Sequence, residues 1–236
     1  MSHAILFVLI LFVFGCSPSS NILSYIEKND FSETEKCINS GIDLNKQYYL
    51  RHIPSYPLTI ACMGSDITII KLLLDSGANP NVVDNRLQMT PVQTAVWQRH
   101  PHLDELVPLL IKYGGDINMN AGKDNTLDYA ISSGDLQAIK VLIDNKAIIN
   151  NDSIITTCNT YPMVSESEIE KIIVYFLDKG LDINYMDVNY PNEKLKGLSA
   201  LDVAILNKNP ELKKFLISHG AKTAETIRKE RLKDSP

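Results

Sequence analysis

The chain has 236 residues, of which 44% are hydrophobic and 22% are charged, and its net charge at neutral pH is −5. This composition is too apolar for a disordered chain and too charged for a multi-pass membrane protein. The acidic balance offers no basic surface for a phosphate backbone, so nucleic acid is not an expected partner. Four cysteines, none of them in a CxxC pair, are too few for a disulfide scaffold and lack the spacing of a zinc or redox site.

The N-terminal segment differs from the rest of the chain. Residues 4–14 are eleven consecutive apolar residues, about half of the roughly 20 that a membrane-spanning helix needs. Gly15 and Cys16 follow, and then a polar stretch begins. The pattern predicts a signal peptide over residues 1–15 and a short tether over residues 16–20.

The four residues Val13 to Cys16 resemble the bacterial lipobox, in which the cysteine is diacylated and becomes the mature N-terminus. Phe14 departs from the usual small or branched residue, and no Lys or Arg precedes the apolar run. The resemblance implies a lipid anchor on Cys16 and, since no Asp follows it, an outer-membrane location facing the periplasm. The alternative is an ordinary secretory signal that is cut elsewhere, in which case Cys16 carries no lipid.

A short pattern recurs through the remaining sequence: an apolar helical run, a Gly, and an Asn four residues after the Gly. The closing Asn residues are 45, 81, 118, 150 and 184, which gives intervals of 36, 37, 32 and 34, and a sixth copy at residues 215–223 lacks the Asn. A second apolar segment precedes most copies, at residues 56–62, 90–96, 125–131 and 199–205. The chain therefore contains an internal repeat with a period near 33 residues.

The repeat, with Thr90-Pro91 at the start of one helix, resembles that of the ankyrin-repeat family and its T-P-L-H-x-A signature. The resemblance implies an all-α solenoid over residues 21–224, with about six helix-turn-helix repeats joined by hairpin fingers. The Gly residues at 41, 77, 114, 180 and 220 suit a left-handed position at the end of each second helix. Lys146 occupies that position in the fourth repeat, where we expect strain or altered geometry.

The fifth repeat is the least regular. So few residues separate Asn150 from the next apolar run at Ile154 that the finger must be short or absent. Its first helix is expected over residues 152–159, because Pro162 disfavours helical geometry in the residue before it. Ser165 and Glu168 form an S-x-x-E capping box that predicts the start of the second helix.

Two further expectations concern helix limits. Pro108 lies in the second helix of the third repeat, so that helix should begin late or kink. Residues 225–233, within a charged C-terminal segment at 225–236, should extend the last helix as a polar cap on the open end of the core.

No catalytic motif is evident, since Walker A, GxGxxG, HExxH and GxSxG patterns are all missing from the sequence and the carboxylates form no convergent pair. We therefore expect no enzyme activity, no cofactor and no small-molecule substrate. His100 and His102 could contact a metal, but without a third ligand they indicate a polar loop. His219 fits a helix end, where a cation interacts favourably with the helix dipole.

The cysteines at 37, 62 and 158 are expected to be buried small hydrophobic residues. In an oxidising periplasm a bridge between Cys37 and Cys62 is the alternative.

The family resemblance implies a partner-binding concave surface made of fingers and first helices. Trp97 and Gln98 fall on it, as do other residues at the ends of first helices and in the fingers: Met63, Ser132, Ser133, Leu206, Asn207, His52, Arg86, Gln88 and Met89. A second cluster in the first finger holds Tyr48, Tyr49, Arg51 and Tyr56. Trp97 is the single Trp and suits a binding hot spot, the alternative being that it packs internally.

Together these features predict a non-enzymatic, membrane-tethered protein-binding module in the bacterial periplasm. Such an architecture resembles immunity proteins that neutralise toxic effectors of type VI secretion, including lipases. The alternatives are a scaffold for envelope assembly, a periplasmic enzyme or protective factor with an unrecognised catalytic group, and, if the leader does not export the chain, an intracellular ankyrin adaptor.

Overall fold

The computed structural model describes residues 18–119, 121, 125–186 and 194–233. These residues form helices and one short hairpin in a simple chain order. The helices are α1 (Pro18–Glu27), α2 (Phe31–Asn39), α3 (Pro57–Ala61), α4 (Ile67–Asp75), α5 (Pro91–Trp97), α6 (Leu103–Lys112), α7 (Thr126–Ser132), α8 (Leu136–Asp144), α9 (Ser153–Asn159), α10 (Glu166–Asp178), α11 (Ala200–Leu206), α12 (Pro210–Ser218) and α13 (Ala224–Lys233). The hairpin strands are β1 (Tyr48–Leu50) and β2 (Ile53–Ser55).

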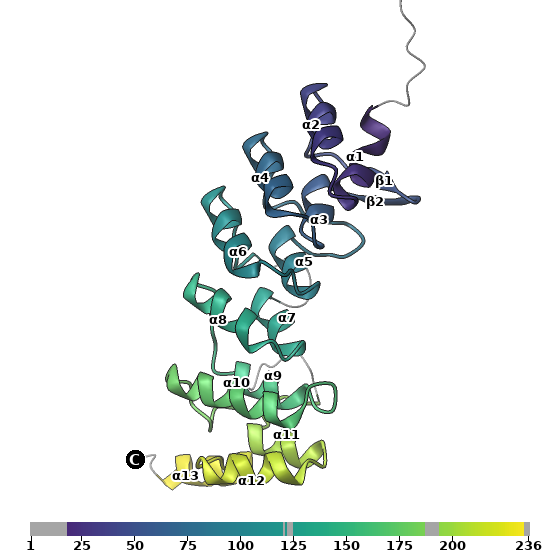
Figure 1. Cartoon of the computed structure of the whole chain (residues 1–236). Coiled ribbons are helices and arrows are strands. Elements are labelled where there is room, and N and C mark those ends of the chain that lie inside the picture. Colours follow the sequence, from purple (N-terminus) through teal and green to yellow (C-terminus); the bar gives the residue numbers. More distant parts are fainter. Residues whose placement is uncertain (1–17, 120, 122–124, 187–193, 234–236) are drawn as a thin grey trace, which may run out of the picture.

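Helices α1 to α12 form six antiparallel pairs stacked in one direction (Figure 1). The odd-numbered helices, here called inner helices, lie in one column together with the β1–β2 hairpin, and the even-numbered outer helices lie in a second column. Inner helices contribute heavily to the interior; in α5 every residue from Pro91 to Val96 is buried. Buried side chains from all six pairs form a single continuous core, so the predicted repeat solenoid is confirmed.

Capping side chains mark the start of several helices. At α5 the Oγ1 of Thr90 accepts from the amide of Gln93, and the Gln93 Oε1 accepts from the amide of Thr90 at 2.9 Å. The predicted box of Ser165 and Glu168 opens α10 in the same way. Helix α9 ends at Asn159, before Pro162, as predicted. Each capping box satisfies two amides that the helix itself cannot pair.

Asparagine side chains connect each repeat to the next. Asn81 Nδ2 donates to the carbonyl of Gly114 at 2.8 Å, and its Oδ1 accepts from the amide of Asp116 at 2.7 Å. The same two bonds are made by Asn45, Asn118 and Asn184. After the fourth repeat, however, Asn151 rather than the predicted Asn150 accepts from the amide of Asp182, at 2.8 Å. The connection without a finger shifts this contact by one residue.

Lys146 keeps the geometry of the glycines that it replaces. Its φ is +72°, and the glycines at the equivalent positions have φ between +82° and +89°. The backbone is therefore unaltered, and the Lys side chain is held in the left-handed region that L-residues disfavour. Of the two expectations for this position, strain is the one that the structure supports.

Three expected boundaries are wrong. Helix α6 begins at Leu103 and continues through Pro108, which is exposed, so the expected late start is wrong. Residues 225–233 do not extend the last helix: α12 ends at Ser218, and α13 is a separate helix after the turn at Gly220. Helix α1 begins at Pro18, so residues 18–20 belong to the first helix and not to a tether.

Candidate functional site

The first finger is the β1–β2 hairpin, in which Tyr48 pairs with Ser55. Strand alternation separates the two tyrosines: Tyr48 is half-buried, and its hydroxyl donates to the carbonyl of Asp43 at 2.9 Å, whereas Tyr49 is 68% exposed. Burial together with the charge of Asp43 raises the pKa of Tyr48. Tyr49 is therefore the tyrosine of this strand that a partner can reach.

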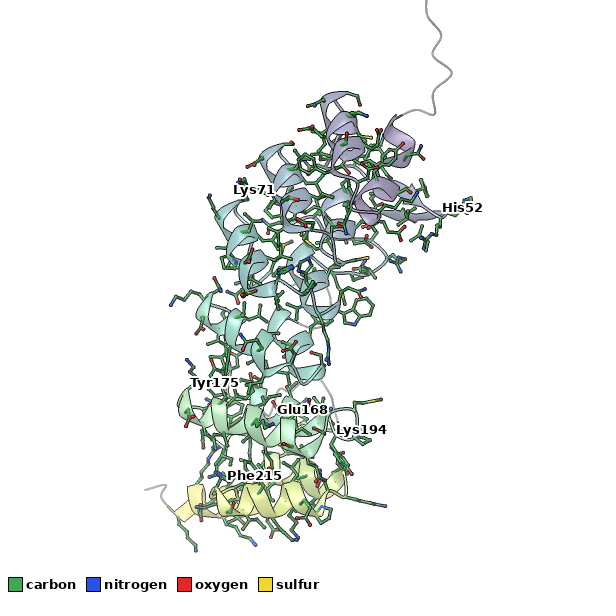
Figure 2. All side chains as sticks on the ribbon, in the orientation of Figure 1. His52, Lys71, Glu168, Tyr175, Lys194 and Phe215 are labelled. Carbon is green, nitrogen blue, oxygen red and sulfur yellow. The ribbon has the colours of Figure 1, made fainter. Side chains whose placement is uncertain are left out.

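The tip of this finger consists of Arg51 and His52, both in left-handed conformation at φ +49° and +69°. The Arg51 guanidinium forms an ion pair with Glu27 at 2.8 Å, which orients the hairpin against α1. His52 lies at the outer end of the hairpin (Figure 2). Ile53, which the sequence analysis did not single out, is 43% exposed on the same finger. Its place opposite Leu50 across the turn is the signal that could have identified it.

The second finger is organised by a buried carboxylate. Asp84 accepts the amides of Arg86 and Leu87 at 3.0 Å, and it also accepts the Ser55 hydroxyl at 2.6 Å from the first finger. Arg86 is exposed as expected.

Two other residues of this finger point in opposite directions. Gln88 is exposed as expected, whereas Met89 is 7% exposed and belongs to the interior, which corrects its assignment as a contact residue. The amide of Asp84 bonds to the carbonyl of Met89, closing the loop and turning this side chain inward.

Trp97 ends α5 and is 49% exposed, so it does not pack internally. Equivalent last residues of inner helices are Ser132 of α7, which is exposed, and Leu206 of α11, which is 55% exposed. Gln98, the residue after Trp97, is also exposed. These positions form a row along the inner column. The row and the exposed finger residues are together called the finger face below; the exposed finger residues are Tyr49, Arg51, His52, Ile53, Arg86 and Gln88.

Other residues assigned to this face are partly covered. Met63 is half-buried against the core. Ser133 and Asn207 are half-buried, and the Asn207 side chain donates to the carbonyl of Cys158 at 3.3 Å. Tyr56 is half-buried at the start of α3. Met163, between α9 and α10, is by contrast 91% exposed. The sequence pattern did not indicate it, because it lies in an irregular connection outside the repeated positions.

The two histidines do not form a metal site. His100 is 4% exposed: its Nε2 lies 3.0 Å from the carbonyl of Ser65, and its Nδ1 accepts from the amide of His102 at 3.2 Å. Burial lowers the pKa of His100. The expected loop is present between α5 and α6, but the His100 side chain is buried in it and links two repeats. Across the described ranges no group of three His, Cys, Asp or Glu side chains could hold a metal ion. His219 caps the end of α12, as expected.

The cysteines at 37, 62 and 158 are buried thiols rather than half-cystines. Burial raises the pKa of all three, which disfavours the reactive thiolate. They act as small core residues, as expected, and the alternative bridge between Cys37 and Cys62 is not formed.

The anchoring features lie elsewhere in the chain. The signal peptide at residues 1–15 and the lipid attachment at Cys16 fall outside the described residues. Within the described ranges, none of the helices has the length and apolar character required to span a bilayer.

Comparisons with known proteins agree with this architecture. The family model for ankyrin repeats in three copies matches residues 26–121 and 58–153. The chain is 27% identical over 203 residues to the ankyrin repeat domain-containing protein OPG023 of Monkeypox virus, covering 76% of this chain and 29% of that protein. It is 31% identical over 100 residues to the transient receptor potential channel pyrexia of Drosophila melanogaster, covering 42% of this chain and 10% of the channel.

The chain thus spans less than a third of the length of these curated relatives. Among solved structures, the human ASB11 ankyrin repeat domain superposes with a TM-score of 0.65 at 18% identity, covering 86% of this chain and 85% of that one. At this identity the likeness concerns the fold alone.

Proposed function

The chain belongs to the ankyrin-repeat family, whose repeats form protein-interaction modules, and from this premise we propose that it is a non-enzymatic binder whose partner docks on the finger face. The half-exposed Trp97 carries the proposal. Trp, Tyr and Arg dominate interface energetics, and burying a large aromatic side chain that is exposed in the free protein contributes strongly to affinity. Trp97 at the end of α5 and Tyr49 on the first finger present two such side chains.

Contacts that hold the two fingers in place favour this face over the outer helices. The Ser55–Asp84 bond joins the first two fingers, and the ion pair with Glu27 holds Arg51. These contacts exist in the free protein, so the fingers are already ordered before a partner binds. Binding therefore costs less conformational entropy than binding to fingers that must first become ordered.

Photo-crosslinking in the producing cell tests the proposal. A photoreactive amino acid is placed at position 97, at position 49, or at position 71 in the outer helix α4. Figure 2 shows Lys71 on the side of the stack opposite His52. We expect a covalent protein adduct from positions 97 and 49 and none from position 71. Adducts from position 71 alone would assign binding to the outer helices and contradict the proposal.

The finer part of the proposal is that the chain is exported and held at the outer membrane by lipid on Cys16. Its support is the apolar run at residues 4–14 and the Gly15-Cys16 junction. Stable anchoring needs two or more acyl chains, which a diacylated cysteine provides. We expect the wild-type chain to incorporate a labelled fatty acid and the Cys16→Ser variant to incorporate none. Label retained in the variant would contradict it.

The partner that fits an anchored binder without catalytic groups is a toxic effector of the lipase type, delivered to the periplasm by type VI secretion. Deleting the gene should then sensitise the cell to a neighbour that secretes the toxin, and Trp97→Ala should fail to restore protection. If resident envelope components form the adducts instead, the alternative role of an assembly scaffold holds.

A further inference from the structure

The last full repeat, α11–α12, has an end that is only partly covered. Asn184 bonds to Gly220 and Lys222 as in the earlier repeats, so the chain enters a further repeat with the usual geometry. Helix α13 then begins with a bond from the amide of Ala224 to Asp202 at 2.8 Å. Its buried residues, Ala224 and Ile227, pack with Met186. Within the described residues no outer helix follows α13, so among these residues no helix packs on α12 in the way that α12 packs on α10.

Lys213 marks the uncovered surface. It lies seven residues before the left-handed residue that closes its outer helix, and it is exposed. Residues at this position in the preceding repeats are all 0% exposed: Thr34, Ile70, Val107, Ile139 and Ile173. Thr34 belongs to the first repeat, which has no repeat before it in the array, so this position is buried by its own repeat and the following one. Lys213 therefore faces the place of a following repeat.

Two apolar side chains lie on the same uncovered end. The sixth residue counted from the start of each inner helix from α3 onward is at most 1% exposed in the internal repeats. It is Val96, Ile131 or Cys158 within α5, α7 and α9, and Cys62 directly after the five-residue α3. Ile205 occupies it in α11 and is 45% exposed. Ile217 of α12 is 51% exposed, whereas its equivalents are buried or half-buried: Ile38, Leu74, Ile111, Ile143 and Leu177. Beside Ile205, a pocket of about 330 Å³ is lined by Lys208, Pro210 and Lys213.

The charge of this end is opposite to that of the rest of the chain. The α11–α12 pair, residues 200–218, contains three basic and two acidic side chains, a net charge of +1, although the whole chain carries −5. Lys214 is compensated by Glu211 at 2.8 Å. Lys208 and Lys213 flank the pocket and form no ion pair with any described residue. An apolar surface bordered by uncompensated lysines is complementary to an apolar surface bordered by carboxylates.

We propose that the open end formed by α11 and α12 is a second docking surface, and that its occupant is an acidic amphipathic helix of a partner protein. The helix would lie along α12, where the outer helix of a following repeat would pack. Its apolar face would cover Ile205 and Ile217, and its carboxylates would pair with Lys208 and Lys213. Helix-on-helix packing of this kind uses the same apolar stripe that joins successive outer helices within the array. The surface adjoins the finger face at Leu206 but uses other residues, and the proposal does not depend on the finger face.

A peptide of residues 165–181 provides a probe, because it is the acidic outer helix α10 with its own capping box and apolar stripe. The blocked, fluorescently labelled peptide is titrated into the full chain and binding is followed by anisotropy. We expect saturable binding that weakens at least tenfold in Lys213→Glu. The matched control Lys214→Glu, an exposed and ion-paired neighbour, should change affinity less than twofold. Trp97→Ala should leave it unchanged, which separates this surface from the finger face.

Several outcomes would overturn the proposal. Equal binding of a scrambled peptide of the same composition would show unspecific charge attraction, and equal effects of Lys213→Glu and Lys214→Glu would mean that the open end is not the site. Absence of peptide binding, with Lys213-dependent binding to phosphatidylglycerol vesicles, would assign the surface to a membrane. If the chain sediments faster at higher concentration and Lys213→Glu abolishes this effect, the open end binds a second copy of the chain.

Discussion

The hydroxyl of Ser55 donates a 2.6 Å hydrogen bond to Asp84 Oδ2, and both residues are 0% exposed. This bond connects the last residue of β2 to the loop of the next finger. Asp84 Oδ1 at the same time accepts two amides of its own loop. One buried carboxylate therefore shapes the second finger and fixes its position relative to the first.

Replacing Ser55 by Ala should lower the free energy of unfolding by about 1–3 kcal/mol, because Asp84 Oδ2 would remain buried without its donor. Urea unfolding followed by circular dichroism measures the loss. Ser76→Ala is the matched control, since Ser76 is exposed at the end of α4, and its effect should be below about 0.5 kcal/mol. Equal losses in the two variants would show that the bond between fingers contributes nothing.

The shifted asparagine contact separates two adjacent residues. Asn151→Ala should destabilise the chain by about 1 kcal/mol, because it removes the acceptor of the Asp182 amide. Asn150→Ala, which alters the residue that the repeat pattern indicates, should have a smaller effect. Thermal unfolding of both variants tests this order. The reverse order would mean that the fourth repeat keeps the register of the others.

Lys146→Gly should raise the free energy of unfolding by about 1 kcal/mol, since glycine adopts positive φ without the clash of a Cβ atom. The reciprocal variant, Gly180→Lys, places a Cβ at φ +87° with no atom within 4 Å, so its cost comes from the backbone alone. It should lower stability by a similar amount. If Lys146→Gly lowers stability, a favourable contact of the lysine outweighs the strain.

His100 makes stability depend on pH. The carbonyl of Ser65 can only accept, so Nε2 donates and Nδ1, which accepts from His102, is unprotonated. Burial lowers the folded-state pKa below that of the unfolded chain, so the unfolded state binds more protons as the pH falls below about 6.5. Stability should therefore decrease between pH 7.5 and pH 5.5.

The comparison with His100→Gln isolates this effect from that of the carboxylates. The variant is expected to be less stable at pH 7.5 and to lose less stability on acidification than the wild type. Exposed His52 supplies the control, because His52→Gln should keep the wild-type slope. If the free energy of unfolding of His100→Gln changes with pH as much as that of the wild type, the pH dependence comes from other groups.

The sequence alone determined the helices and their order, because their signals are local. Thr90-Pro91 and the box of Ser165 and Glu168 satisfy amides within one helical turn, so neighbouring residues suffice to predict α5 and α10. The repeated apolar stripes likewise predicted the stack, since each pair buries its stripe only against another pair. The exposed positions of Trp97, Gln98 and Arg86 followed from the same register.

Only the tertiary structure decided which side chains meet across repeats. The burial of Met89, the bond between Ser55 and Asp84, and the choice of Asn151 over Asn150 depend on how a loop closes against a neighbour many residues away. The exposure of Lys213 has the same origin, because the residue looks like any helix lysine until its buried equivalents are superposed. Local sequence specifies which backbone groups are paired within a turn; the packing of one repeat on the next specifies what remains exposed.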